Sequence, residues 1–263
     1  MTAAELEALI LDIAPRTGEL PGDTNGLVYG SGATQVTGVA VTWTPSLAVL
    51  SQAVAAGLNF ILTHESPFFM ATQHAWFEVT PTDEKPANLA RRAILGRFGL
   101  VVCRCHSNWD GVRTEGVVDS TARTLGLFVE THSSRFMRVY EIGERCLSEL
   151  ALDVRTRLGL RVVRVAGDLA ASVTRVGLAV GGLAQNWNYL DELLANGAQA
   201  VIVGEAMDYS VRIAVDSGVG LIETSHVASE NPGMRNFARL LRKALPDELP
   251  VTFLDAGHPW TYL

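Results

Sequence analysis

Two stretches of the sequence repeat one order of apolar runs and amphipathic segments, and this repetition constrains the fold more than any other feature. The first stretch joins an apolar run at 36–41 to another at 59–63 through a helical segment that ends in Ala-Ala-Gly. The second joins 176–180 to 200–203 through a segment that ends in Ala-Asn-Gly. Short apolar runs joined by helical segments predict β-α-β units with parallel strands. Because a helix, a strand and a histidine motif follow each unit, we infer an internal duplication.

Helices and strands are predicted to alternate along most of the chain. The helices are expected over residues 2–15, 45–56, 86–98, 117–125, 146–158, 187–195, 209–217 and from about 234 to 244. The strands are expected over 27–29, 36–41, 59–63, 100–105, 136–142, 161–166, 176–180, 200–203, 219–224 and 251–254. This order predicts an α/β fold of two similar lobes, 1–130 and 131–263, each built on a mostly parallel sheet.

The composition excludes several classes of protein. With 48% hydrophobic and 19% charged residues in 263, the chain can bury a substantial core. A net charge of −7 argues against nucleic-acid binding through a basic surface. The N-terminus has neither the basic start nor the apolar stretch of a signal peptide, and no apolar run reaches the roughly 18 residues of a membrane span. We therefore expect a cytoplasmic protein with no membrane association.

Three cysteines are too few, and odd in number, for a disulfide framework. Cys103 and Cys105 share one face of a predicted strand, where small buried side chains are the default interpretation. A metal or redox role stays open for Cys105, because it directly precedes His106.

Three clusters of histidine and carboxylate follow predicted strands. Two of them have a histidine four residues before an acid, and the third has adjacent histidine and glutamate. They are His106 with Asp110, His226 with Glu230, and His64 with Glu65. In open parallel sheets, ligands collect beyond the carboxyl ends of the strands. The clusters therefore predict a metal site, which the duplication would place between the two lobes.

Each cluster also has a simpler interpretation. His64 and Glu65 could form a partly exposed polar pair at the start of a loop, although the following Ser-Pro supplies a turn that would let both reach one pocket. A single His-x-x-x-acid pair is often a surface pair. Two such pairs at matched places in a duplicated chain favour the metal site.

The six side chains together suit two ions better than one. Three imidazoles and three carboxylates are typical of Zn²⁺, Mn²⁺ or Fe²⁺ and are too rich in nitrogen for a dedicated Ca²⁺ or Mg²⁺ site. They exceed the needs of one tetrahedral zinc ion. Two divalent ions with a bridging carboxylate could ionise a shared water, with Glu65 or Glu230 as the base of a hydrolase.

Six segments resemble motifs of the Nif-three-like family, many of whose members are named GTP cyclohydrolase I type 2. Residues 60–69 are similar to the family's strand and "THHPLFF" signature, 105–110 to "HTNxD", 174–182 to "RVAVCGGSG", 204–205 to "TGE", 225–230 to "GHxxSE", and 23–27 to "DNxGL". The matches occur in order over about residues 20–255, so the resemblance covers nearly the whole chain.

The resemblance implies a two-lobed α/β fold, a di-metal site at the six positions and a ring-shaped homohexamer. One position departs from the family, which usually has a second histidine where this chain has Glu65. A carboxylate there adds negative charge, favours harder metals and could bridge two ions. The alternative is that Glu65 weakens or removes one metal position, which makes His64, Asp110, His226 and Glu230 the first choice as ligands.

Two functions follow as hypotheses. The first is a cytoplasmic metal-dependent hydrolase of a small phosphorylated or nucleotide-like substrate. The second is a non-catalytic metal-binding adaptor or regulatory protein, in which the ions are structural or regulatory.

Overall fold

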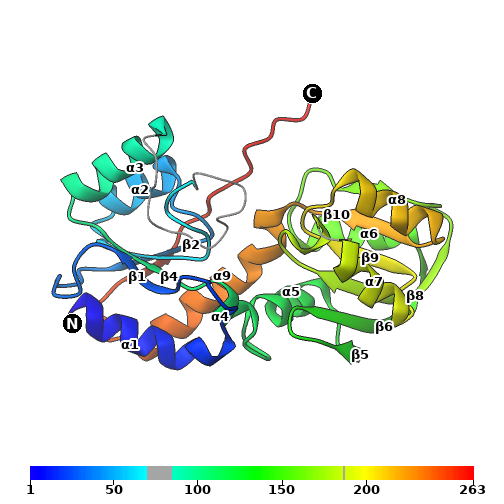
Figure 1. Cartoon of the computed structure of the whole chain (residues 1–263), viewed down its shortest axis with the longest axis horizontal. Coiled ribbons are helices and arrows are strands. Elements are labelled where there is room, and N and C mark those ends of the chain that lie inside the picture. Colours follow the sequence, from blue (N-terminus) through cyan, green and yellow to red (C-terminus); the bar gives the residue numbers. More distant parts are fainter. Residues whose placement is uncertain (70–84, 186) are drawn as a thin grey trace. The chain divides into compact units, whose positions relative to one another are not determined.

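The computed structural model describes residues 1–69, 85–185 and 187–263, which form two compact units (Figure 1). The first unit contains residues 1–112 and 234–263, and the second contains 113–233. The division at residue 130 predicted from the sequence follows the repeated order of elements, whereas these units follow packing. The predicted α/β class is confirmed, with one sheet in each unit.

The sheet of the first unit is mostly parallel. Its strand order is β1-β4-β3-β2-β11, and only the pairing of β1 with β4 is antiparallel. Its strands are β1 (Gly26–Tyr29), β2 (Val39–Thr42), β3 (Phe60–Thr63), β4 (Val101–Arg104) and β11 (Val251–Phe253). Every residue of β2, β3 and β4 is buried, which is typical of parallel strands covered on both faces.

Helices cover both faces of this sheet. They are α1 (Ala3–Ile13), α2 (Leu47–Ala55), α3 (Pro86–Arg97), the short α4 (Ser107–Asp110) and the second half of α9 (His226–Ala244). Figure 1 shows α2 and α3 on one side of the sheet and α1 with that half of α9 on the other. Helix α1 begins with a capping box, in which the side chains of Thr2 and Glu5 accept from each other's backbone N–H groups.

The second unit has a six-stranded sheet in the order β5-β6-β8-β9-β10-β7. Its strands are β5 (Val129–Ser133), β6 (Met137–Cys146), β7 (Arg164–Ala166), β8 (Ser172–Ala179), β9 (Ala200–Val203) and β10 (Gly220–Glu223). Its helices are α5 (Val117–Leu125), α6 (Leu147–Arg157), α7 (Trp187–Ala195), α8 (Asp208–Asp216) and the start of α9. Strands β8, β9 and β10 are parallel, whereas β5, β6 and β7 pair antiparallel.

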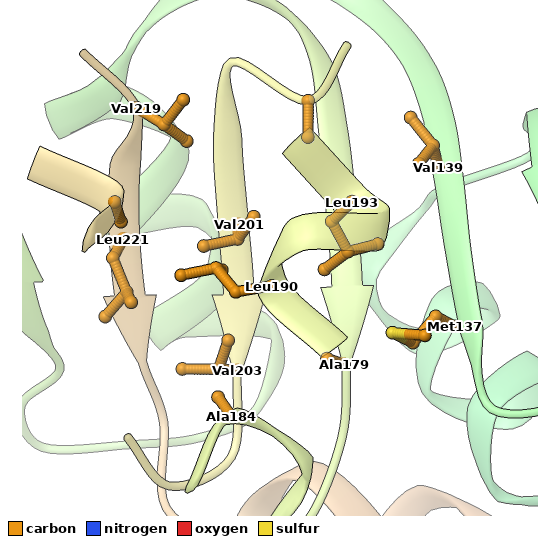
Figure 2. Packing of buried hydrophobic residues seen from close by; sticks show 12 residues of the cluster. Met137, Val139, Ala179, Ala184, Leu190, Leu193, Val201, Val203, Val219 and Leu221 are labelled. Atoms are coloured by element: carbon orange, nitrogen blue, oxygen red, sulfur yellow. The ribbon is translucent and has the colours of Figure 1, made fainter. Parts of the chain in front are cut away.

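One hydrophobic core of the second unit lies between α7, α8 and the sheet. Leu190 and Leu193 of α7 pack against Val201 and Val203 of β9, as Figure 2 shows. Leu221 of β10 belongs to the same cluster. All of these side chains are at most 2% exposed, and each contributes roughly 1.5–3 kcal/mol of burial free energy.

The repeated order of elements is present in both units. A helix, an edge strand and three strands joined by two helices occur as α1-β1-β2-α2-β3-α3-β4 and again as α6-β7-β8-α7-β9-α8-β10. The strand orders β1-β4-β3-β2 and β7-β10-β9-β8 also match, including the antiparallel edge strand. The topology therefore supports the duplication. The hairpin of β5 and β6 is an addition to the second sheet, and its first strand was not predicted.

Helix α9 is longer than predicted, and the expectation that it would begin only after Asn231-Pro-Gly was wrong. It begins at His226 and continues through Pro232. A proline inside a helix costs about 3 kcal/mol. Four fully buried side chains follow at helical spacing, namely Met234, Phe237, Ala238 and Leu241. At roughly 1.5–3 kcal/mol for each large one, their burial outweighs the proline.

Within the described residues, no helix combines the length and the apolar character that crossing a membrane requires.

Candidate metal centre

His64 and Glu65 directly follow β3, and the end of β2 fixes their backbone. The N–H of Glu65 donates to the carbonyl of Trp43 at 2.8 Å, and Thr63 Oγ1 donates to the carbonyl oxygens of Trp43 and Glu65. The side chain of His64 is fully buried, and that of Glu65 is partly exposed. These bonds support the turn predicted after β3, and they hold adjacent residues at one end of the sheet.

The ring of His64 is oriented by a backbone carbonyl. Its Nδ1 lies 2.9 Å from the carbonyl oxygen of Cys105. Because a carbonyl oxygen only accepts, Nδ1 donates this hydrogen bond, so Nε2 is the ring nitrogen that would ligate a metal. This Nε2 lies 3.4 Å from Oδ1 of Asp110. An imidazole nitrogen beside a carboxylate oxygen is a donor pair that a divalent ion can bind.

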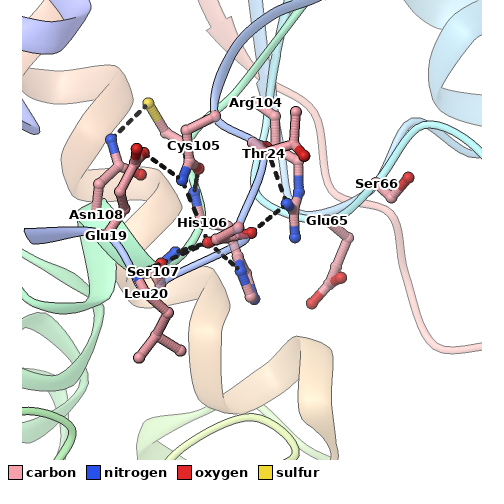
Figure 3. A network of polar contacts seen from close by, with 12 residues as sticks. Glu19, Leu20, Thr24, Glu65, Ser66, Arg104, Cys105, His106, Ser107 and Asn108 are labelled. Atoms are coloured by element: carbon pink, nitrogen blue, oxygen red, sulfur yellow. Dashed lines mark hydrogen bonds and ion pairs between the residues drawn. The ribbon is translucent and has the colours of Figure 1, made fainter. Parts of the chain in front are cut away.

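The ring of His106 is oriented by a carboxylate. His106 follows β4, and its Nδ1 lies 2.9 Å from Oδ2 of Asp23. Figure 3 shows His106 within a polar network that also includes Arg104 and Ser107. The rings of His64 and His106 are 4.9 Å apart, and the ligand atoms of His64, Glu65 and His106 lie within 4.8 Å of one another.

Asp23 is ionised although it is buried. Burial raises the pKa of its carboxyl, but the hydrogen bond and charge of His106 lower it more, with help from Arg104 and Ser107. The resulting pKa lies well below the usual range of aspartate. Burial lowers the pKa of His106, whereas the bond with Asp23 raises it, and the net pKa lies above the usual value. The pair is a carboxylate–histidine unit of the kind that supports metal ligands.

Asp110 is carried by the one-turn helix α4. The N–H groups of Trp109 and Asp110 donate to the carbonyl of His106 at 2.8 and 3.0 Å, so the turn begins at the histidine. Trp109 is fully buried and stacks on Phe237 of α9, with ring centroids 4.2 Å apart. One helical turn therefore joins His106 to Asp110, and Trp109 anchors it.

The second unit brings its own histidine and carboxylates together. His226 Nε2 lies 3.3 Å from Oε2 of Glu230, and His226 Nδ1 lies 3.3 Å from Oε2 of Glu205. Glu230 is buried, and Glu205 follows β9. The hydrogen bond with His226 is the largest cause that lowers the pKa of Glu205, and Gln185 also bonds this carboxylate. Glu205 thus holds the Nδ1 side of His226, while Glu230 lies on the Nε2 side.

Two glycines let the backbone approach this second-unit cluster of Glu205, His226 and Glu230. Gly181 follows β8 with φ +63°, and a Cβ there would overlap Oε1 of Glu230. The N–H of Gly181 donates to Oγ of Ser229, which in turn donates to the carbonyl of His226. A Cβ on Gly204 would lie 2.6 Å from the same Ser229 oxygen. The backbone is thus tightly packed next to the cluster at both glycines.

The donor sets fit a divalent ion of the zinc, manganese or iron type. The first-unit cluster consists of His64, Glu65, His106 and Asp110. In both clusters each histidine has an acceptor at Nδ1 and is left to ligate through Nε2, which is the arrangement that outer-shell partners give to metal-bound histidines. His226 and Glu230 belong to the second unit, and the expectation that all six residues serve one centre between the lobes stays a prediction.

Sequence reasoning missed the contact between Asp23 and His106. The segment of Asp23 was identified only by its similarity to "DNxGL". Asp23 lies 83 positions before His106 in the chain, and the antiparallel pairing of β1 with β4 brings the two regions together. The available signal was a short polar segment directly before a predicted strand.

Comparison with known proteins identifies one family. The sequence model of Duf34/NIF3 (NGG1p interacting factor 3) matches residues 1–259. A Clostridium perfringens protein named GTP cyclohydrolase 1 type 2 homolog is 22% identical over 273 aligned positions, which cover 97% of each chain. A Nostoc sp. protein with the same name is 27% identical over 213 positions, covering 78% of this chain and 77% of its own.

Solved structures share the fold over the whole chain. The structure titled protein ybgI, unknown function, has a TM-score of 0.85 at 25% identity and covers 99% of this chain and 100% of its own. A Bacillus cereus protein related to NIF3 has a TM-score of 0.82 at 15% identity, with 100% and 99% covered. Reduced HcgD from Methanocaldococcus jannaschii has a TM-score of 0.78 at 19% identity, with 98% of both chains covered.

Proposed function

Because the chain belongs to the Duf34/NIF3 family, we propose that it is a metal-dependent hydrolase of a small phosphorylated or nucleotide-like substrate. The proposed ligands of two divalent ions are His64, Glu65, His106, Asp110, His226 and Glu230. The observation that carries the proposal is that each of the three histidines has an acceptor at Nδ1. In addition, Nε2 of His64 lies 3.4 Å from Asp110 Oδ1, and Nε2 of His226 lies 3.3 Å from Glu230 Oε2. The name of the curated relatives, GTP cyclohydrolase 1 type 2 homolog, supports a nucleotide-like substrate.

The chemistry divides between the ions and the chain. Bound zinc, manganese or iron would act as a Lewis acid and lower the pKa of water, so that hydroxide is available as a nucleophile near neutral pH. The imidazoles of His64 and His106 are held in one orientation, so no reorganisation is needed on binding. Glu65 and Glu230 are the proposed bases, since each carboxylate lies at a cluster and can accept a proton at an oxygen that does not ligate.

The experiment is a hydrolysis screen on one preparation in a metal-free state and in three metal-loaded states. The protein is stripped with a chelator and reloaded separately with Zn²⁺, Mn²⁺ and Fe²⁺, and each state is assayed on phosphoester, nucleotide and peptide substrates. We expect turnover of a phosphoester or nucleotide in a loaded state only. Stoichiometric metal without turnover on any class would instead support the adaptor or regulatory function.

Glu65→His is expected to shift the metal preference towards zinc. An imidazole is a softer ligand than a carboxylate, and the change also removes one negative charge from a site that contains His64 and His106. We expect the ratio of Zn²⁺ to Mn²⁺ affinity to rise about tenfold, which corresponds to about 1.4 kcal/mol. Competition titrations of both metals measure it. An unchanged ratio would mean that Glu65 is not a ligand.

The assembly and the compartment are part of the same proposal. We propose a homohexamer in the cytoplasm, which the family resemblance and the absence of a membrane-spanning helix among the described residues support. Light scattering on the purified protein is expected to give six times the chain mass of 28.3 kDa. A monomeric mass would reject the hexamer.

A further inference from the structure

We propose that Asp23 is a positioning residue for the metal centre, where it holds the ring of His106 so that Nε2 is the ligating nitrogen. This inference rests on the proposed function. Asp23 contributes no atom to the predicted ligand set, and its side chain is fully buried.

The two oxygens of Asp23 receive a nearly complete set of hydrogen bonds. Oδ2 accepts from His106 Nδ1 at 2.9 Å, from the N–H of Ser107 at 3.1 Å, from Ser107 Oγ and from Asn25 Nδ2 at 3.2 Å. Oδ1 accepts from Arg104 Nη1 at 2.6 Å. A carboxylate with this many donors has one orientation, so the proton between it and His106 stays on Nδ1.

Arg104 connects this carboxylate to the other histidine of the first-unit cluster. Its Nη1 bonds Asp23, and its Nε donates to the carbonyl of His64 at 3.2 Å. The next residue, Cys105, supplies the carbonyl that accepts from His64 Nδ1. Figure 3 shows Arg104, Cys105 and His106 in succession along this network. Residues 104–106, at the end of β4, therefore orient both imidazoles. Among the contacts described, Asp23 is the buried anion that these residues bond.

Asparagine cannot replace Asp23 without a loss at one of its two sides. An amide has one acceptor oxygen and one donor NH₂. With its oxygen towards His106, the NH₂ faces the guanidinium of Arg104. With its oxygen towards Arg104, the NH₂ donates to Nδ1 of His106, and the proton moves to Nε2, where it blocks the ligand position. The isosteric variant thus tests the tautomer and not the packing.

The probe is Co²⁺ alone, measured on the full-length protein. Its affinity is determined by competition with a chelating dye, and its visible d–d spectrum reports the coordination geometry. Asp23→Asn is compared with the wild type and with Asp119→Asn. Asp119 is the matched control, because it is a buried aspartate that bonds the fully buried Arg138 at 3.1 Å and has no described contact with a candidate ligand.

We expect Asp23→Asn to lower the Co²⁺ affinity by about 10- to 100-fold and to change the d–d spectrum, as loss of an outer-shell partner does. Asp119→Asn should keep both. A folded Asp23→Asn with wild-type affinity and spectrum would overturn the proposal, and so would an equal loss of affinity in both variants.

If Asp23→Asn does not fold, Ser107→Ala decides, because it removes one donor to Asp23 and should weaken Co²⁺ affinity by a smaller factor. Unchanged affinity in Ser107→Ala would then overturn it. A wild type that binds no Co²⁺ would reject the proposed function itself.

Discussion

Gly181→Ala is expected to prevent metal binding by the second-unit cluster. It is also expected to lower the free energy of unfolding by more than the cost of placing an alanine at a positive φ. With φ at +63°, an alanine costs about 1–2 kcal/mol. The new Cβ would also overlap Oε1 of Glu230 and lie 3.1 Å from His226 Nε2. Because Glu230 is buried, displacing its carboxylate separates the two donors, which now lie 3.3 Å apart. Co²⁺ titration and thermal unfolding measure the two effects.

Gly218→Ala is the matched control for the backbone cost. Gly218 has φ +72° and belongs to the same unit, and no atom of the described residues lies within 4 Å of an added Cβ. We expect this variant to lose about 1–2 kcal/mol of unfolding free energy and to keep the wild-type affinity for Co²⁺. If both variants bound the metal equally well, Glu230 would have no role as a ligand.

Asp110→Ala is expected to give the second large effect, a loss of metal affinity beyond the roughly 10- to 100-fold typical of an outer-shell partner. Asp110 lies 3.4 Å from His64 Nε2, at the end of a turn that the buried Trp109 holds in place. Removing the carboxylate takes away a charged donor and leaves the anchor of the turn unchanged. If the proposed hydrolase activity is present, turnover by the metal-loaded protein should fall in parallel with Co²⁺ affinity.

The control for this variant is Asp12→Ala. Asp12 is an exposed aspartate of α1 in the same unit. The Asp12→Ala substitution removes the same charge from the chain as Asp110→Ala and should leave the metal affinity unchanged. Circular dichroism shows whether Asp110→Ala is folded. A folded Asp110→Ala that retained the affinity of the Asp12→Ala protein would remove Asp110 from the ligand set.

Local pattern was sufficient to predict most elements of the fold. The strand at β9 and the helix at α7 have their predicted bounds, because apolar periodicity and glycine ends are local signals. The same holds for α5, which ends at Gly126 with φ +73°. The placement of three histidines after strand ends also came from local pattern, and β3, β4 and β10 confirm that they follow strands.

Features that depend on distant partners could not be predicted. Strand β11 pairs with β2, although most of the sequence lies between them, and residues 234–263 belong to the first unit. Helix α9 continues through Pro232 because side chains beyond it are buried. The support of His106 by Asp23 needs the pairing of β1 with β4. In each case the contact that determines the structure joins segments that are distant in sequence, and neither sequence indicates that the other is its partner.

The most direct test of the account is the metal content of the purified wild-type protein. Inductively coupled plasma mass spectrometry gives the number of zinc, manganese and iron ions per chain after desalting. The two histidine–carboxylate clusters predict about two divalent ions per chain. Reconstitution of the stripped protein with each metal should restore the same number. A content well below one ion per chain in both the purified and the reconstituted protein would contradict the account.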